Sequence, residues 1–441
     1  FSELLRGAVT DTGVETPQVW FLYWLDGTGT TNSVDAGLQS GVCSALATNL
    51  LFGSNYIYLV MASNTAGVGY SGTNGFTTTD KEWDAPSNGN WSVAVNWKDR
   101  AAPIPTVPSA LRFGGAGGDP KYHSTNDMGT FKVNTLTFTN DNGSVTNVLA
   151  GNLLEFWNSG AAVEQGGGGS FIVSNMVNLT TGVIFSGSGT GTVILATNVT
   201  GVGSLTKQGS WTLVLAGSNS FVGPVTVNST GGTVRLDNLS GLGTNSITVS
   251  QGTVWANVGA GLYTNGRGAA QTMLVTGTNS LWTNSGGFAV GPNAQVTVTN
   301  GGRLSGAGNS FIGTNGPNSA VRIVGGAGAT SRWEVGTAAT PRSLTVGGGP
   351  AAANSLLYID GGDVPLGAVA TNVGAFTVGT AASMSNTVTL TNTRFFTGGA
   401  IGFGNGSSYN SINVLSNAVW NLGGYTLNVG SGYGSTGNVL T

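Results

Sequence analysis

Hydrophobic and polar residues alternate in short runs along most of this chain, which is the pattern of β-strands that bury one face. In residues 1–79, such runs are separated by turn signals, for example Asp26-Gly27 and Asn74-Gly75. The runs are Leu4–Thr10, Gln18–Leu25, Tyr56–Ala62 and Gly72–Thr79. This part of the chain, which we call the head, therefore predicts a small β-sandwich.

From about residue 131 the pattern becomes repetitive, with short β-branched runs divided by steps of Gly, Ser and Asn. An apolar residue followed by Gly recurs at intervals of 22, 34, 32, 25 and 26 residues, at Val290-Gly291, Ile312-Gly313, Val346-Gly347, Val378-Gly379, Phe403-Gly404 and Val429-Gly430. A period in the twenties and thirties is typical of a parallel β-helix. We predict an all-β protein with a right-handed parallel β-helix, or β-solenoid, of roughly ten to twelve coils over residues 131–441.

The composition agrees with a stacked β-structure. The 441 residues include 75 Gly and only 33 charged residues, or 7%, whereas an ordinary domain has about a quarter. This combination excludes a mainly helical protein. In a parallel β-helix, equivalent side chains lie ~4.8 Å apart on successive coils, so a column of like charges would repel itself. Gly and Asn suit the corners, where the backbone adopts positive φ and stacked Asn side chains bond to one another.

Two kinds of partner are disfavoured by the sequence. No apolar run approaches the ~18 residues of a membrane-spanning helix, and no basic cluster indicates nucleic-acid binding. Residues 1–164 carry 14 acids and 7 bases, a net charge of −7, whereas residues 165–441 carry 4 acids and 8 bases, a net charge of +4. This asymmetry weakly favours contact between the head of one molecule and the body of another.

Residues 80–130 form a junction that differs from both neighbours in its tryptophans, charges and prolines. Trp83, Trp91 and Trp97 precede a proline-rich run at residues 102–108. The first coil of a solenoid must be covered, and tryptophan supplies a large apolar area. We predict that these three residues cap the solenoid, and contact with a glycan is the alternative. We also expect Trp255, Trp282, Trp333 and Trp420 to pack against the solenoid. The alternative is that they form an exposed platform for a glycan.

Catalytic chemistry has few residues to use in this chain. Cys43 is the one cysteine and His123 the one histidine, so neither a disulfide nor a thiol–imidazole pair is supported. Enzymes built on β-helices use clustered carboxylates. In residues 165–441 only Asp360 and Asp363 lie close together, and Asp360-Gly361 is a turn dipeptide. We therefore expect no catalytic residue, no cofactor and no metal, and we rank a carbohydrate-active enzyme below the non-catalytic alternatives.

Residues 50–79 resemble the last two strands of a fibronectin type III domain. Leu50 and Tyr56 have the spacing of that family's tyrosine corner. On this resemblance, Leu4–Gly13 match the second strand and the first strand is absent, which leaves one sheet edge without a partner. The chain begins at Phe1 without a signal peptide, so we expect a processed or partial product, and truncation is one explanation of the missing strand.

The segment 203–228 resembles the autotransporter-associated β-strand repeat. The residues at its pattern positions are Leu205, Lys207, Gly209, Leu213, Leu215, Gly217, Asn219, Phe221, Gly223, Val225 and Val227. Proteins with such repeats are typically large secreted proteins of Gram-negative bacterial surfaces, and few of them are enzymes. The resemblance therefore implies a secreted extracellular protein with a structural or adhesive function.

The unpartnered sheet edge of the head also predicts self-association. A strand donated by a neighbouring molecule would cover this edge, and the C-terminal strand of the solenoid is a suitable donor. We therefore predict a homo-oligomer that associates head to tail into a fibre. The residues expected to take part are Leu4, Leu5 and Val9 on the head and Asn438, Val439 and Leu440 at the C-terminus. A fragment of a longer passenger, and an adhesin that binds glycans, are the alternatives.

Overall fold

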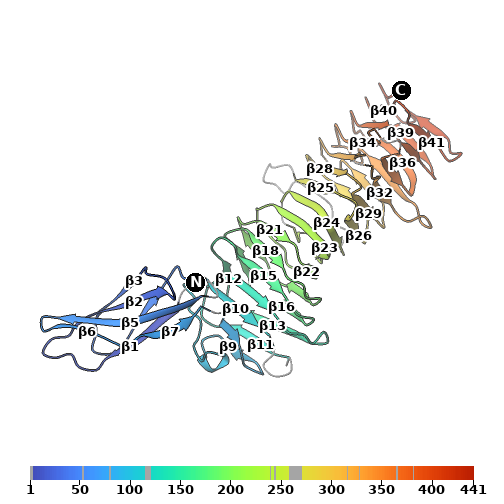
Figure 1. The fold of residues 1–441 in the computed structure, drawn as a ribbon. Coiled ribbons are helices and arrows are strands. Elements are labelled where there is room, and N and C mark those ends of the chain that lie inside the picture. Colours follow the sequence, from blue (N-terminus) through green and yellow to red (C-terminus); the bar gives the residue numbers. More distant parts are fainter. Residues whose placement is uncertain are drawn as a thin grey trace.

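The protein is an elongated all-β molecule, in which small antiparallel sheets precede a parallel β-solenoid of about 12 turns (Figure 1). The structure is a computed structural model. It describes residues 3–441 except 52–53, 79–80, 115–120, 239, 243–244, 258–270, 315, 327, 364–365 and 381. The predicted fold class is thereby confirmed at the level of antiparallel sheets followed by a parallel solenoid.

The head consists of two antiparallel sheets that share one core. The first sheet pairs β1 with β4, and the second has the order β3-β2-β5-β6, with β7 also paired to β5. The strands are β1 (Glu3–Val9), β2 (Gln18–Leu25), β3 (Asn32–Leu38), β4 (Gly41–Ala47), β5 (Asn55–Asn64), β6 (Gly67–Tyr70) and β7 (Asn74–Thr77). Leu5 and Cys43 from the first sheet pack with Phe21 and Val60 from the second. Apolar side chains on alternate positions therefore hold the two sheets together.

Three strands of the head were not indicated by the alternation of the sequence. The predicted runs correspond to β1, β2, β5 and β7, but β3, β4 and β6 were missed. All four residues of β6 are exposed, and β3 has no fully buried residue. Strands such as β3 and β6, which bury little of either face, have no need of an apolar side chain at every second position, so their pattern is weak. This reason does not apply to β4, which buries Cys43, Ala45 and Ala47.

Parallel pairing begins at Lys81, some fifty residues before the predicted start of the solenoid at 131. The first strands are β8 (Lys81–Trp83) and β9 (Gly89–Asn90), which pair with β10 (Ser109–Phe113) and β11 (His123–Asn126). A short 3-10 helix, η1 (Ala94–Asn96), lies between β9 and β10. Because β8 and β9 have three and two residues, they are too short to show an alternating pattern. The junction thus already carries rungs of the ladder.

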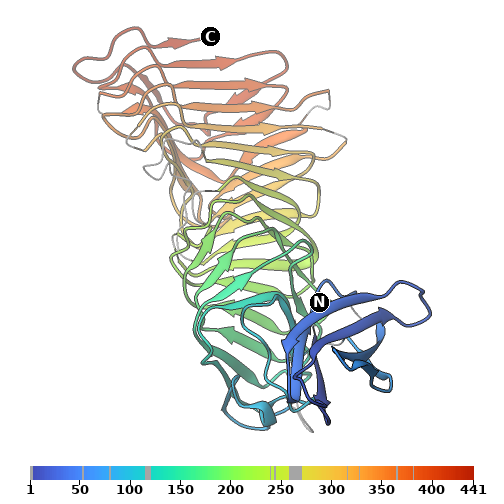
Figure 2. The ribbon, with the colours of Figure 1, turned by 90° about the vertical axis from the view of Figure 1, so that its left-hand side faces the viewer.

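The first half of the solenoid proper continues this parallel ladder without a change of direction. Its strands are β12 (Phe131–Phe138), β13 (Thr146–Gly151), β14 (Leu154–Phe156), β15 (Ala162–Gln165), β16 (Ser170–Val173), β17 (Val177–Leu179), β18 (Val183–Ser186), β19 (Thr192–Leu195), β20 (Val199–Gly201), β21 (Leu205–Lys207), β22 (Thr212–Leu215), β23 (Val225–Leu236) and β24 (Ile247–Ala256). Figure 2 shows the strands stacked along one axis.

In the second half, the stacked strands form three faces. The first face contains β25 (Thr272–Thr276), β28 (Gln295–Thr299), β31 (Ala320–Val324), β34 (Leu356–Asp360), β37 (Thr387–Thr391), β40 (Ser411–Val414) and β43 (Val439–Leu440). The second face continues from β24 through β26 (Ser280–Asn284), β29 (Arg303–Gly306), β32 (Ser331–Val335) and β35 (Ala368–Thr371) to β38 (Arg394–Phe396) and β41 (Val419–Asn421). The third face contains β27 (Ala289–Val290), β30 (Ser310–Ile312), β33 (Arg342–Val346), β36 (Val373–Thr380), β39 (Ile401–Asn405) and β42 (Leu427–Val429).

The apolar–Gly repeat of the sequence forms a single column on the third face. Strand pairing aligns Val290 with Ile312, and then, in order, with Val346, Val378, Phe403 and Val429. From Gly313 onward, the glycine that follows each of these residues has positive φ, for example 79° at Gly313 and 78° at Gly347. Each coil therefore turns at the same point, where a side chain would be strained.

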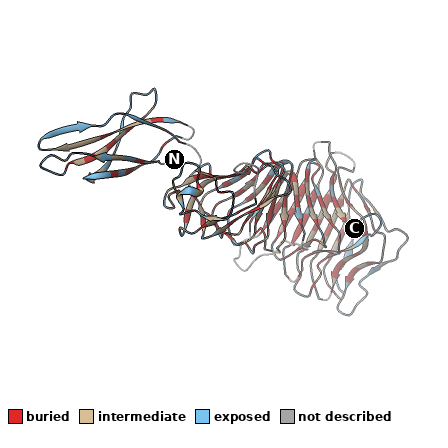
Figure 3. Ribbon diagram, turned by 90° about the horizontal axis from the view of Figure 1, so that it is seen from below, coloured by how far each residue is buried: buried red, intermediate tan, exposed pale blue. Residues whose placement is uncertain are grey.

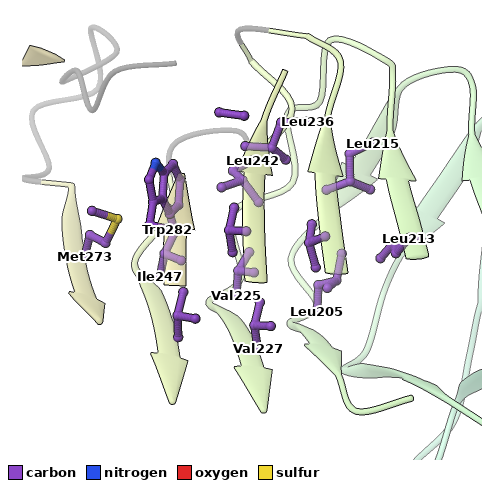
Figure 4. Packing of buried hydrophobic residues seen from close by; sticks show 14 of the residues in the cluster. Leu205, Leu213, Leu215, Val225, Val227, Leu236, Leu242, Ile247, Met273 and Trp282 are labelled. Atoms are coloured by element: carbon purple, nitrogen blue, oxygen red, sulfur yellow. The ribbon is translucent and has the colours of Figure 1, made fainter. Parts of the chain in front are cut away.

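The interior is a continuous apolar column lined by equivalent residues of successive coils. Leu205, Val225, Ile247 and Met273 are aligned by strand pairing, and all are at most 2% exposed (Figure 4). Burial of each such side chain contributes roughly 1.5–3 kcal/mol of hydrophobic stabilisation. Figure 3 shows buried residues repeated on strand after strand of the solenoid.

Asparagine side chains stack at two corners, as the composition predicted. At one corner, Asn318 donates to Asn293 (3.0 Å) and Asn354 donates to Asn318 (3.2 Å), and all three have φ near 60°. At another, the buried Asn386 donates to Asn410 (2.8 Å), which donates to Asn438 (2.8 Å). The bonds of the second corner satisfy the buried amides of Asn386 and Asn410, whereas the three asparagines of the first corner are exposed.

Candidate functional site

The three junction tryptophans lie inside the first coils of the solenoid. Trp83, Trp91 and Trp97 are 2%, 0% and 0% exposed. The ring centroids of Trp83 and Trp97 are 5.4 Å apart in edge-to-face contact, and Trp91 makes the same contact with Phe131 at 5.0 Å. Trp91 Nε1 donates to Ser124 Oγ (2.6 Å). A sugar would have to displace this aromatic cap to reach any of the three rings.

Ion pairs fasten the segment after the tryptophans to the outside of the cap. Lys98 Nζ lies 2.9 Å from Glu82, Arg100 pairs with Asp84 at 3.2 Å, and Lys81 pairs with Asp99. Such exposed pairs contribute little individually. These six charged residues are therefore paired on the surface of the junction, while its tryptophans fill the interior.

Strand β1 has an unpaired edge within the described residues. It pairs with β4 on one side, and its sheet contains no other strand. Leu5 points into the head core and is 1% exposed, Val9 packs against that core, and Leu4 is partly exposed. Tyr58 Oη donates to the Arg6 carbonyl (3.0 Å). Arg6 therefore turns its backbone groups away from β4 and towards the open edge, as do its alternate neighbours in the strand.

The beginning of β1 faces the proline-rich segment of the junction across a small cavity. This cavity, of about 70 Å³, is lined by Glu3, Leu4 and Arg6 of the head and by Lys81, Ala101, Ala102, Ile104 and Ser109. Burial raises the pKa of the Glu3 carboxyl above its usual value, against the opposing effect of Lys81. A donated strand at the open edge would therefore lie next to residues 101–104.

The predicted donor residues form the last described rung of their own solenoid. Val439 and Leu440 pair in parallel with Ser411 and Ile412 and are 52% and 46% exposed. Asn438 Oδ1 accepts hydrogen bonds from the backbone N–H (3.1 Å) and Nδ2 (2.8 Å) of Asn410. Pairing with another molecule would therefore have to use the second edge of β43.

The Asp360–Asp363 pair of the sequence forms a turn. Asp360 accepts hydrogen bonds from Tyr358 Oη (2.8 Å) and from the Gly362 N–H (2.9 Å). The bond to Asp360 raises the pKa of the Tyr358 hydroxyl. Asp363 is exposed. In the part of the chain that the structure describes, no three His, Cys, Asp or Glu residues gather as metal ligands.

Lys207 is a buried lysine that was predicted from the sequence only as a repeat position. Its side chain is 0% exposed and lies in an interior column between Phe185 and Val227. The Nζ atom donates to the Gly209 carbonyl and lies 4.1 Å from the centre of the Trp211 ring. Burial lowers the pKa of this amine from 10.5 to about 7.

The later tryptophans divide between the interior and the surface. Trp282 and Trp333 are 2% and 0% exposed, and Trp420 packs at the edge of the core, whereas Trp255 is 38% exposed. Packing is therefore confirmed for Trp282 and Trp333. Trp255 remains available to a ligand.

Comparison of the chain with family models, with curated proteins and with solved structures finds no match. Within the described residues, no helix has the length and apolar character needed to cross a membrane.

A group of arginines on the second face was also missed by the sequence analysis. Arg303 Nη2 contacts both carboxylate oxygens of Glu334 (3.1 and 3.2 Å), and Arg332 Nη1 lies 3.6 Å from the same group. Arg303 lies 29 positions before Arg332 and 31 before Glu334, and the short Arg332–Glu334 spacing alone does not indicate a site. Only the register of the strands brings the two arginines onto neighbouring rungs.

Proposed function

We propose that this protein is a secreted, extracellular structural or adhesive β-solenoid, in which the solenoid is a stiff spacer that carries the head. The observation that supports this most directly is the unbroken ladder, a single sheet of 28 strands that runs from β8 to β43. Each coil is bonded to its neighbours, and one apolar cluster extends from Trp83 to Ile412. A stack of this kind resists bending and local opening because every internal rung is paired on both sides.

The arrangement of the head supports a fibronectin type III-like module. A sheet of β1 and β4 faces a sheet ordered β3-β2-β5-β6, which is the order of that fold without its first strand. The Leu51 N–H donates to Tyr56 Oη (3.0 Å), and Leu50 is buried. This is the hydrogen bond that a tyrosine corner makes. We propose that identity for the head.

The segment 203–228 supports an autotransporter-type repeat. Leu205, Leu213 and Leu215 point into the core and are 0% exposed. A Cβ at Gly217 would collide with the Thr197 carbonyl, and one at Gly223 with the Gly203 carbonyl. The repeat's leucines and glycines thus occupy positions that the coil requires. A right-handed coil is proposed as well, since parallel crossovers are almost always right-handed.

Small-angle X-ray scattering tests the proposed spacer. About 12 turns at ~4.8 Å each give a solenoid roughly 58 Å long, to which the head is attached. We expect a pair-distance distribution with the long tail of a rod and a cross-section that does not change with concentration. A symmetric distribution typical of a compact particle would contradict the proposal.

A further inference from the structure

The second face of the solenoid presents three arginines in one outward column, which we call the arginine column. Arg303 pairs with Arg332, and Arg332 pairs with Val369. The next strand on this face is β38, where Thr393 Oγ1 donates to the Ala368 carbonyl (2.6 Å), and we infer from this bond that Arg394 lies beside Val369. The column therefore carries Arg303, Arg332 and Arg394 on three of four successive strands, with ~4.8 Å between neighbouring strands.

The positive charge of this column is only partly compensated. The side chains of Arg303 and Arg332 are 47% and 44% exposed, and Arg394 is exposed as well. Glu334 is the carboxylate that Arg303 and Arg332 share. Among the described residues Arg394 makes no ion pair, so three cations face one anion. In a chain with 7% charged residues, this is a local excess of two positive charges on an otherwise neutral wall.

The neighbouring outward column of the same strands has an aromatic ring at each end. It runs from Trp255 through Thr283, Ser305, Glu334 and Thr371, and the alignment that we infer for β38 continues it to Phe396. Trp255 is 38% and Phe396 51% exposed. The five steps between the two rings span ~24 Å. The two columns together form a narrow strip with hydroxyl groups between the rings and guanidinium groups alongside.

We propose that this strip binds an acidic polysaccharide, which makes the solenoid the adhesive part of the function proposed above. A guanidinium group binds a carboxylate through two parallel hydrogen bonds. Exposed aromatic rings pack against the apolar face of a sugar while polar groups bond to its hydroxyls. A linear polyanion matches charges that are spaced along an axis, whereas a globular acidic partner would contact one end of the strip.

Isothermal titration with a hexamer of galacturonic acid at low ionic strength tests this proposal, with maltohexaose as the neutral counterpart. We expect binding of the acidic hexamer only, and an affinity that falls as NaCl is added. The double variant Arg303→Gln/Arg332→Gln should bind at least tenfold more weakly. Arg322→Gln, which removes an exposed arginine from β31 on the first face, is the matched control and should change the affinity less than twofold.

The variant Glu334→Gln should change the affinity for the acidic hexamer in the opposite direction. The carboxylate of Glu334 competes with the ligand for two guanidinium groups, so its removal should tighten binding several-fold. A glutamate oligomer serves as a second comparison ligand, since it is acidic but is not a sugar. The proposal would be overturned if maltohexaose or the glutamate oligomer bound as tightly as the acidic hexamer. It would also be overturned if the double variant kept its affinity or if Glu334→Gln bound more weakly. Scattering from the same samples keeps the two proposals separate, because an intact rod without binding overturns the site and leaves the spacer function standing.

Discussion

Lys207 is a polar residue in a column of the solenoid interior whose neighbouring members are apolar. The contacts of its amine are a carbonyl oxygen and an indole ring. A charged amine in such a place lacks the solvation that it has in water. The folded state therefore favours the neutral form, and the pKa falls to about 7.

This shift predicts a pH dependence of stability. Between pH 7 and pH 10.5 the unfolded chain binds more protons at this site than the folded chain does, so the free energy of unfolding should rise with pH through that window and change little below it. From pH 7 to pH 9.5 we expect a gain of roughly 2–3 kcal/mol, measured by urea unfolding. In Lys207→Met this rise should disappear. Lys132→Met, which removes a lysine that lies over the Trp157 ring on the surface, should retain it, and an identical rise in all three proteins would contradict the assignment.

The aromatic cap acts at the scale of the element. Strands β8 and β9 are the shortest rungs at this end of the ladder, and the rings of Trp83, Trp91 and Trp97 take the place of the aliphatic columns that fill later coils. Trp91 contacts Trp97, Phe113 and Phe131. The stability of the first coils therefore depends on this ring more than on hydrogen bonds between short strands.

Trp91→Ala should open this end of the solenoid while leaving the other coils closed. Loss of a buried tryptophan costs about 3–5 kcal/mol, and in a solenoid that cost falls on neighbouring coils first. Hydrogen–deuterium exchange should lose protection in residues 81–138 and keep it beyond residue 290. Trp255→Ala, at an exposed position, should leave exchange unchanged at both ends. Uniform loss of protection in Trp91→Ala would show that the coils unfold as one unit.

At this scale the sequence predicted the repeat better than its boundaries. The Val290 to Val429 column was visible because every coil needs an apolar residue and then a glycine at the same turn. The parallel pairing of β8 and β9, which lie in the predicted junction, was not predicted because these two strands are too short to show a pattern of their own. The arginine column was invisible because Arg332 and Arg394 are 62 residues apart, and no local rule relates them without the register.

At the scale of the whole molecule, the proposed self-association depends on the open edge of β1. The backbone groups of Arg6 and of its alternate neighbours Leu4 and Ala8 face that edge, whereas those of Leu5 face β4. The net charge of −7 in residues 1–164 and +4 in residues 165–441 favours contact between different parts of two molecules.

Ala8→Pro should therefore prevent fibre formation without unfolding the head. Proline removes one N–H donor from the open edge and is tolerated there, while pairing with β4 is kept. Light scattering and electron microscopy at high protein concentration should show fibres for the unchanged protein and for the control Ala8→Ser, and single particles for Ala8→Pro. Single particles in all three samples would refute head-to-tail assembly.

The third-face column keeps its alignment although the chain between successive members varies from 22 to 34 residues. Loops on the outside thus absorb a difference of twelve residues without altering the rise of the coil. An epitope of that length, inserted in one of these loops, would be held at a fixed height above the base, and a series of insertions would provide a molecular ruler with one graduation per coil.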